Sequence, residues 1–132
     1  MFLHVDPSNG LAIYDQIVRG IKFAVADGAL VQGELAPSVR ELARDLVVNP
    51  NTVARAYQQL QTDQVLETVR GRGLAVARGA AQRCRKERVT LIDKRIAQVL
   101  SEAHQSGLSD EELRELFEQS LAALAPRKAR SE

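Results

Sequence analysis

Hydrophobic residues recur at helical spacing in the first part of the chain. Ile13, Ile17, Ile21 and Val25 lie four residues apart, with charged and polar positions between them. Residues three or four apart share one face of a helix, so this pattern predicts an amphipathic helix. Gly28 follows, and glycine ends helices readily because it adopts the left-handed conformation at little cost. We therefore predict a first helix that ends near Gly28.

Two more helices follow with a short connection between them. Ser38 and Glu41 have the spacing of a capping box, in which each side chain bonds the other residue's backbone N–H. Asn49 and Pro50 suit a third helix start, because Asn caps free N–H groups and Pro is tolerated at the first helical position. The predicted buried faces are Val39, Leu42, Ala43 and Leu46, then Val53, Ala56, Tyr57 and Leu60. The short link over residues 47–49 is typical of a helix-turn-helix.

A β-hairpin is predicted directly after the third helix. Residues 65–69 and 74–77 are short runs that favour β-structure. They flank the glycine-bearing turn at residues 70–73, and such a pattern indicates a hairpin. A hairpin in this position is the wing of a winged helix. We predict a mainly α fold with a small hairpin, in which residues 1–78 form a winged helix-turn-helix.

The pattern after Gly79 predicts two helices separated near Gly107. Ser109 and Glu112 again have capping-box spacing, and Pro126 is expected to end the second helix before a tail at residues 127–132. Two such helices cannot bury both of their apolar stripes alone. We therefore predict that residues 79–126 form a homodimer with a second copy. The predicted dimerisation residues are Ile92, Ile96, Val99, Leu100, Leu113, Leu116, Phe117 and Leu121.

Composition narrows the class of protein. The chain has 132 residues, 45% hydrophobic and 27% charged, as in ordinary globular domains. It shows neither a signal peptide nor an apolar run of about 18 residues, so a cytoplasmic location is predicted. Cys84 is the single cysteine, and His4 and His104 lie far apart without a ligand cluster. We expect no metal, no cofactor, no catalytic residues and no enzymatic activity.

The net charge of +1 hides an uneven distribution. Residues 78–95 carry seven basic side chains against the two acids Glu87 and Asp93, whereas acids gather at residues 110–118. A near-neutral average can therefore contain a basic face and an acidic face. Charge alone favours the simpler interpretation of a solvated helix surface.

A set of short motifs, in order and at the right spacing, resembles the GntR family of bacterial repressors. The motifs lie at residues 14–17, 33–34, 37–43, 49–57 and 70–73, and the resemblance covers about residues 11–78. An ordered set is far more specific than any single motif. The short C-terminal part, with residues 107–112, resembles the YtrA subfamily. Members of that subfamily often regulate their own gene and a neighbouring ABC-transporter operon, and their C-terminal region mainly dimerises.

Four positions depart from the family pattern. Ala12 and Ala36 stand where Pro and Leu are common, and Val47 and Gln64 replace frequent glycines. If positions 47 and 64 require a positive φ, a β-branched Val47 fits poorly. These departures concern local turn geometry rather than the fold.

The resemblance implies how the chain binds DNA. The third helix lies in the major groove with Asn51 and Thr52 at the base edges, and Arg40 reaches a guanine. Arginines flanking the wing glycine enter the minor groove, where a narrow A·T-rich groove attracts them. The helix starts and the remaining arginines contact phosphates. The expected DNA-binding residues are Ser38, Arg40, Arg44, Asn49, Asn51, Thr52, Arg55, Arg70, Gly71 and Arg72.

These patterns predict a sequence-specific repressor that binds a pseudo-palindromic operator as a homodimer. By the resemblance, it controls its own operon and a neighbouring ABC transporter. The alternative is a winged-helix protein-interaction module that does not bind DNA, since fold alone does not fix function. The group Arg40, Asn51, Thr52, Arg70 and Arg72 favours DNA, because a protein-docking wing more often presents apolar residues. A small-molecule effector is left open.

Overall fold

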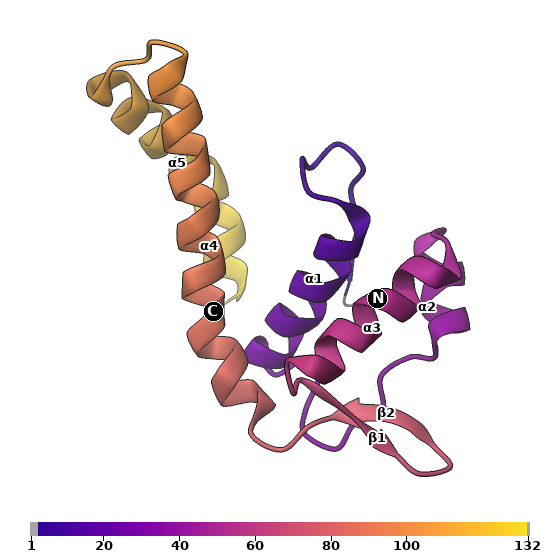
Figure 1. Cartoon of the computed structure of the whole chain (residues 1–132). Coiled ribbons are helices and arrows are strands. Elements are labelled where there is room, and N and C mark those ends of the chain that lie inside the picture. Colours follow the sequence, from indigo (N-terminus) through magenta and orange to yellow (C-terminus); the bar gives the residue numbers. More distant parts are fainter. Residues whose placement is uncertain (1–2, 132) are drawn as a thin grey trace. The chain divides into compact units, whose positions relative to one another are not determined.

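The computed structural model describes residues 3–131, and side chains through Leu124. The predicted fold class is confirmed: the chain is mainly helical with one two-stranded hairpin (Figure 1). Its elements are α1 (Ile13–Asp27), α2 (Val39–Leu46), α3 (Pro50–Thr62), β1 (Leu66–Val69), β2 (Gly73–Val76), α4 (Ala80–Gln105) and α5 (Asp110–Ser131). The chain divides into two compact units, one within the first 90 residues and one from Leu91 onward.

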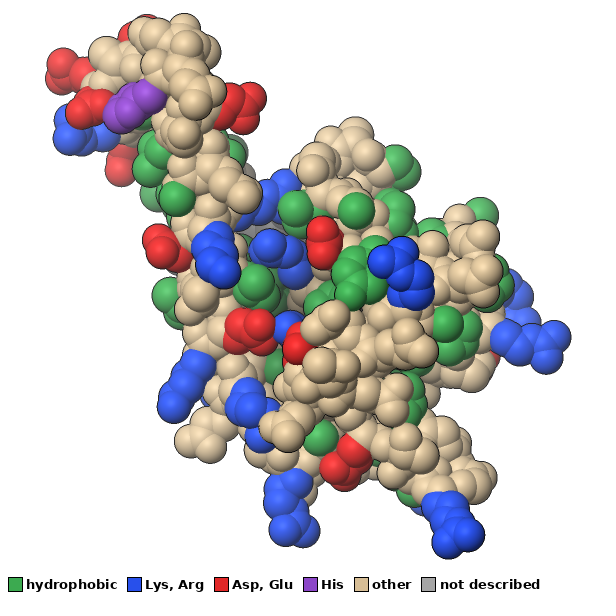
Figure 2. All heavy atoms as spheres, in the orientation of Figure 1, with side chains coloured by type: hydrophobic (Ala, Val, Ile, Leu, Met, Phe, Trp, Pro, Cys, Tyr) green, Lys and Arg blue, Asp and Glu red, His purple; other side chains and the backbone are tan. Residues whose placement is uncertain are grey.

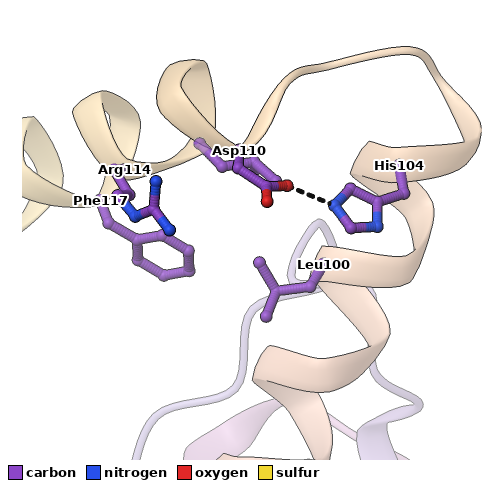
Figure 3. Close-up of a pocket in the computed structure, with 6 residues that line it drawn as sticks. Leu100, His104, Asp110, Arg114 and Phe117 are labelled. Atoms are coloured by element: carbon purple, nitrogen blue, oxygen red, sulfur yellow. Dashed lines mark hydrogen bonds and ion pairs between the residues drawn. The ribbon is translucent and has the colours of Figure 1, made fainter.

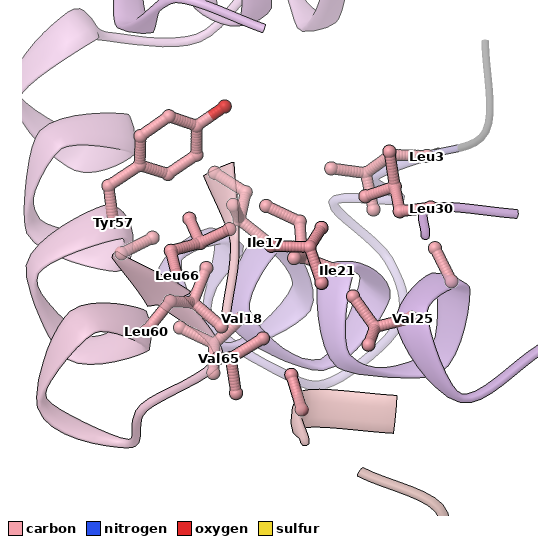
Figure 4. Packing of buried hydrophobic residues seen from close by; sticks show 14 of the residues in the cluster. Leu3, Ile17, Val18, Ile21, Val25, Leu30, Tyr57, Leu60, Val65 and Leu66 are labelled. Atoms are coloured by element: carbon pink, nitrogen blue, oxygen red, sulfur yellow. The ribbon is translucent and has the colours of Figure 1, made fainter. Parts of the chain in front are cut away.

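The first unit has a closed hydrophobic core. Ile17 and Ile21 of α1 and Leu60 of α3 are completely buried, and Val65 and Leu66 cover them from the start of the hairpin (Figure 4). Burial of each such side chain stabilises the fold by about 1.5–3 kcal/mol. The helical stripes predicted for α1 and α3 thus face each other and hold the helix-turn-helix in place.

Local capping signals fix the ends of the helices as predicted. Gly28 ends α1 in the left-handed conformation, with φ of 86°. At α2, the Glu41 N–H donates to Ser38 Oγ (3.1 Å) and the Ser38 N–H donates to Glu41 Oε1 (3.0 Å). At α3, Asn49 Oδ1 accepts the Asn51 N–H (2.8 Å) and Pro50 is the first helical residue. The capping box and both helix starts are confirmed.

Two turns require a left-handed backbone at residues that are not glycine. Val47 ends α2 with φ of 56°, and Gln64 follows α3 with φ of 61°. In the described part of the chain they are the two non-glycine residues with positive φ. They are also the two positions where glycine is frequent in the family the sequence resembles. Val47 bears the greater strain, because a β-branched side chain fits this conformation poorly.

The wing is a short antiparallel hairpin attached to the segment before α2. Leu66 pairs with Val76 and Val69 with Gly73, which leaves a three-residue loop over residues 70–72. Leu35 forms a bridge to Ala75, and the Ala36 N–H donates to the Leu74 carbonyl (2.8 Å). These bonds hold the hairpin beside the residues that lead into α2.

Helix α4 begins inside the first unit. Ala80 and Cys84 are completely buried in its core cluster. The first turns of α4 therefore belong to the same compact unit as the winged helix, and this unit extends to Thr90. The end of the DNA-binding domain at residue 78 stays a prediction.

In the second unit, a left-handed Gly107 and a capping box between Ser109 and Glu112 start α5, as predicted. Helix α5 continues to Ser131, so the predicted helix end at Pro126 is wrong. A proline removes one backbone donor, which weakens a helix without always ending it. None of the described helices is long and apolar enough to cross a membrane.

Candidate nucleic-acid interface

The first turn of α2 presents an exposed, unpaired arginine beside a capped helix start. Arg40 is the second residue of α2, and Ser38 caps that helix. The Arg40 side chain makes no hydrogen bond or ion pair with the described part of the chain. Arg44 lies one turn later and is also exposed. An unpaired guanidinium keeps all five donors available for a bidentate partner such as a guanine edge or a phosphate.

The start of α3 is polar and accessible. Asn51 is exposed, Thr52 is half-buried, and the Thr52 N–H donates to the Asn49 carbonyl (3.0 Å). Arg55, one turn further, lies over the ring of Tyr14 with its guanidinium carbon 4.9 Å from the ring centroid. This cation–π contact restrains Arg55, which the sequence had suggested only as a phosphate contact.

The wing carries two exposed arginines at its tip. Arg70 and Arg72 flank Gly71, whose φ of 76° allows the tight turn closed by the Arg72 N–H on the Val69 carbonyl (2.9 Å). Figure 2 shows basic side chains projecting from the end of the hairpin. Arg72 also lines a groove of about 720 Å³ together with Ser38. The structure thus brings the wing next to the start of α2, which the sequence alone did not show.

The first 90 residues carry the features of a known family of regulators. The model of the family "Bacterial regulatory proteins, gntR family" matches residues 13–76. The chain is also 35% identical over 113 residues to the HTH-type transcriptional repressor YtrA of Bacillus subtilis (strain 168), which covers 86% of this chain and 87% of that protein. The chain belongs to the GntR family. The resemblance found in the sequence, including that to YtrA, is confirmed.

Solved structures agree with this assignment. A GntR family transcriptional regulator from Listeria monocytogenes matches with a TM-score of 0.64 and 31% identity, covering 85% of this chain and 97% of that one. YtrA from Sulfolobus acidocaldarius, a GntR-family transcription factor, matches with a TM-score of 0.57 and 29% identity over 76% of this chain and 99% of that one. The chain is therefore a GntR-family transcriptional regulator with a winged-helix DNA-binding fold.

A buried ionic cluster in this GntR regulator was missed by the sequence predictions. Lys22 of α1 is 4% exposed, and its Nζ donates to Asp63 Oδ2 (2.8 Å) and Glu87 Oε1 (2.9 Å). Burial lowers the pKa of Lys22, but the hydrogen bonds and charges of the two carboxylates outweigh it and raise the pKa overall. Lys22 follows Val18 by four residues, so both side chains lie on the same face of α1, and Val18 is buried there. That spacing was the one available signal.

Two other ionisable groups in the first unit have shifted pKa values. The backbone and hydroxyl hydrogen bonds from Ser38 hold the pKa of Glu41 below its usual value, so this carboxylate keeps its charge at the start of α2. Burial raises the pKa of the Cys84 thiol. A buried thiol of raised pKa is unreactive, which agrees with a core position rather than a redox site.

The predicted dimerisation residues lie on the two helices of the second unit. Leu113 is buried and Leu100 half-buried, and the other six are exposed: Ile92, Ile96, Val99, Leu116, Phe117 and Leu121. Near the turn between α4 and α5, Leu100 and Phe117 extend toward a notch of about 340 Å³ (Figure 3). His104 Nε2 lies 2.9 Å from Asp110 Oδ1 beside it. Within this unit, most of the apolar stripe is left in contact with solvent.

Proposed function

We propose that this GntR regulator is a repressor that binds a pseudo-palindromic operator as a homodimer. The proposal is supported by the exposed guanidinium groups of Arg40, Arg70 and Arg72, which pair with no group in the described part of the chain and lie in one compact unit with the polar start of α3. Exposed guanidinium groups without a protein partner are available to neutralise phosphates, and the phosphate backbone of DNA is a polyanion.

The base contacts come from two helix starts. Helix α3 enters the major groove, and Asn51 and Thr52 contact base edges from its first turn. Arg40 binds the O6 and N7 atoms of a guanine with its planar fork. Asn pairs best with adenine, so the proposed half-site contains both a guanine and an adenine.

The remaining predicted residues position the protein on the backbone. Ser38 Oγ accepts the Glu41 N–H in the capping box, and its hydroxyl proton stays available for a phosphate. Asn49 likewise caps α3 with its carbonyl oxygen and keeps its amide donors. Arg44 and Arg55 contact phosphates, whereas Arg70 and Arg72 reach the minor groove on either side of Gly71.

The homodimer forms through the C-terminal helices. Exposed large apolar residues concentrate there, with Leu121 58% and Val99 49% exposed in the single chain. A second copy of the same stripe can cover this surface, as in most soluble homo-oligomers. Two winged helices then read two half-sites about one helical turn apart.

Repression follows when the operator overlaps a promoter. The relative from Bacillus subtilis is named as a repressor, which supports the same direction of control here. We propose that the regulated genes are the protein's own operon and a neighbouring ABC transporter, and that the protein acts in the cytoplasm.

The test uses DNA from immediately upstream of the protein's own gene. Fluorescence anisotropy at several salt concentrations should give sub-micromolar binding with a steep negative salt slope, and much weaker binding to unrelated DNA. Arg40→Ala should weaken specific binding by about 1–3 kcal/mol. Arg85→Ala, which removes another exposed arginine outside the proposed interface, is the matched control. Equal affinity for both DNAs, unchanged by Arg40→Ala, would favour the protein-interaction module.

A further inference from the structure

A continuous series of polar contacts runs from α4 to the DNA-reading helix α3. It begins at Glu87 in the first turns of α4, whose carboxylate accepts a hydrogen bond from Lys22 Nζ (2.9 Å). The same Nζ donates to Asp63 Oδ2 (2.8 Å) at the end of α3. The Lys22 side chain is 5% exposed, whereas its two carboxylate partners Asp63 and Glu87 are 28% and 40% exposed. One buried cation therefore joins three helices of the first unit.

The series continues along α3 to a proposed DNA contact. Asp63 Oδ1 accepts a hydrogen bond from Gln59 Nε2 (2.9 Å), and Gln59 Oε1 accepts one from the Tyr14 hydroxyl (3.2 Å). The ring of Tyr14 lies under the Arg55 guanidinium, 4.9 Å from centroid to carbon. The first four contacts of this path are hydrogen bonds and the last is a cation–π contact, so a shift of one side chain changes the position of the next.

The two carboxylate oxygens of Asp63 have different partners, so a change at Lys22 can reach Gln59 through this side chain. One carboxylate oxygen serves Lys22 and the other serves Gln59. If Glu87 is removed, the buried Lys22 ammonium loses one of its two anionic partners, and its attraction to the Asp63 carboxylate pulls the two groups closer together. A shift of the Asp63 carboxylate toward Lys22 also moves its other oxygen, which accepts from Gln59, and so changes how the Gln59 amide faces the Tyr14 hydroxyl. The ring of Tyr14 under Arg55 is then held by its packing against the core without a fixed hydrogen bond at its hydroxyl.

We propose that Glu87, Lys22 and Asp63 act as positioning residues, which hold Arg55 ready for a DNA phosphate through Gln59 and Tyr14. This inference rests on the proposed function, because it deepens the role of one residue in DNA binding. A side chain that is already immobilised loses less entropy on binding, so its contact is stronger. The seating of α4 against α1 thereby adjusts affinity for DNA without touching it.

The chain supplies a matched control for this path. Arg88, next to Glu87, also joins α4 to α1, through an exposed ion pair with Asp27 (3.3 Å) that includes no residue of α3. Glu87→Ala should weaken binding to the upstream fragment about three- to tenfold, whereas Arg88→Ala should change it less than about twofold. Glu87→Gln retains an acceptor for Lys22 and should recover part of the loss. Thermal unfolding of each variant shows whether the fold is intact.

Two readouts separate this inference from the proposed function. In a double-mutant cycle, Arg55→Ala should cost less in the Glu87→Ala background than in the wild type, because the contact is already weakened. Without DNA, the NMR signal of the Arg55 Nε–H, shifted by the Tyr14 ring, should move in Glu87→Ala and stay in Arg88→Ala. If that signal stays in both variants, the positioning path is wrong even when DNA binding is confirmed. If it moves but the wild type binds no DNA specifically, the path exists and the proposed function fails.

Discussion

The two units of this GntR regulator contain similar apolar stripes that differ in how deeply they are buried. In the first unit, Ile17 and Ile21 of α1 are completely buried against α3 and the hairpin. In the second unit, Ile96 of α4 and Leu121 of α5 remain 40% and 58% exposed. Both stripes have helical spacing, so periodicity alone does not separate them. The difference shows that the first unit closes its own core, whereas the second leaves its stripe exposed in the single chain, where we propose that a second copy covers it.

The largest effect is expected from a cavity in the closed core. Leu60→Ala removes a completely buried side chain, so it should lower the free energy of unfolding by about 2–5 kcal/mol. Chemical denaturation followed by circular dichroism measures this change. Leu124→Ala, at a position 48% exposed on α5, serves as the control and should cost far less in the single chain. Similar losses for both variants would remove the contrast between the two units.

The next effect concerns the open stripe. Leu121→Lys places a charge in the surface that we propose is covered by a second copy, and should weaken the dimer about 100-fold or more. Light scattering coupled to size-exclusion chromatography should then show a monomer at concentrations where the wild type is a dimer. The winged helix should keep its fold, because Leu121 lies in the other unit. A dimer of unchanged strength would place the interface elsewhere.

A smaller effect is expected at the turn between α2 and α3. Val47 has φ of 56° and a side chain 88% exposed, so Val47→Gly relieves strain and loses no buried surface. The left-handed conformation costs about 1–2 kcal/mol, and glycine loses about 0.5–1 kcal/mol in entropy. The net result should be a gain of about 0.5–1 kcal/mol in unfolding free energy. Gln64→Gly should gain less, since glutamine is not β-branched. A loss of stability at position 47 would show that no strain is stored there.

The smallest effect should come from the two capping boxes, one in each unit. Hydrogen bonds from Ser38 and Ser109 hold the pKa values of Glu41 and Glu112 below the ordinary 4.5. Carboxylates with lowered pKa contribute stability above that ordinary value and lose it as the pH falls through the folded value. Unfolding free energies at about pH 6 and about pH 3.5 should therefore differ less in Glu41→Gln than in the wild type. An identical pH dependence would mean that the capping box at α2 contributes nothing.

The sequence predicted the features that depend on neighbouring residues. Both capping boxes, the left-handed Gly28 and the turn at Gly71 involve residues within a few positions, so local chemistry determines them. The sequence also pointed to positions 47 and 64 as places where φ could be positive, because glycine is frequent at both positions in the family.

Contacts between distant residues were not predictable in the same way. Lys22 and Glu87 are 65 positions apart, and Tyr14 meets Gln59 across 45. Nothing in the local pattern pairs these residues, and a lysine in an amphipathic helix is ordinarily exposed. The sequence also predicts the end of α5 wrongly, because Pro126 removes only one backbone donor and the helix continues to Ser131.

We propose that two winged helices, joined by their C-terminal helices, bind one operator. The direct test first maps the operator in the upstream fragment by nuclease protection, and then measures anisotropy with that sequence, once with both half-sites and once with one half-site scrambled. The wild type should bind the complete site far more tightly than the single half-site, and Leu121→Lys should bind both with similarly weak affinity. Equal affinity of the wild type for the two DNAs, or tight binding by Leu121→Lys, would show that the C-terminal helices do not join two winged helices on one operator.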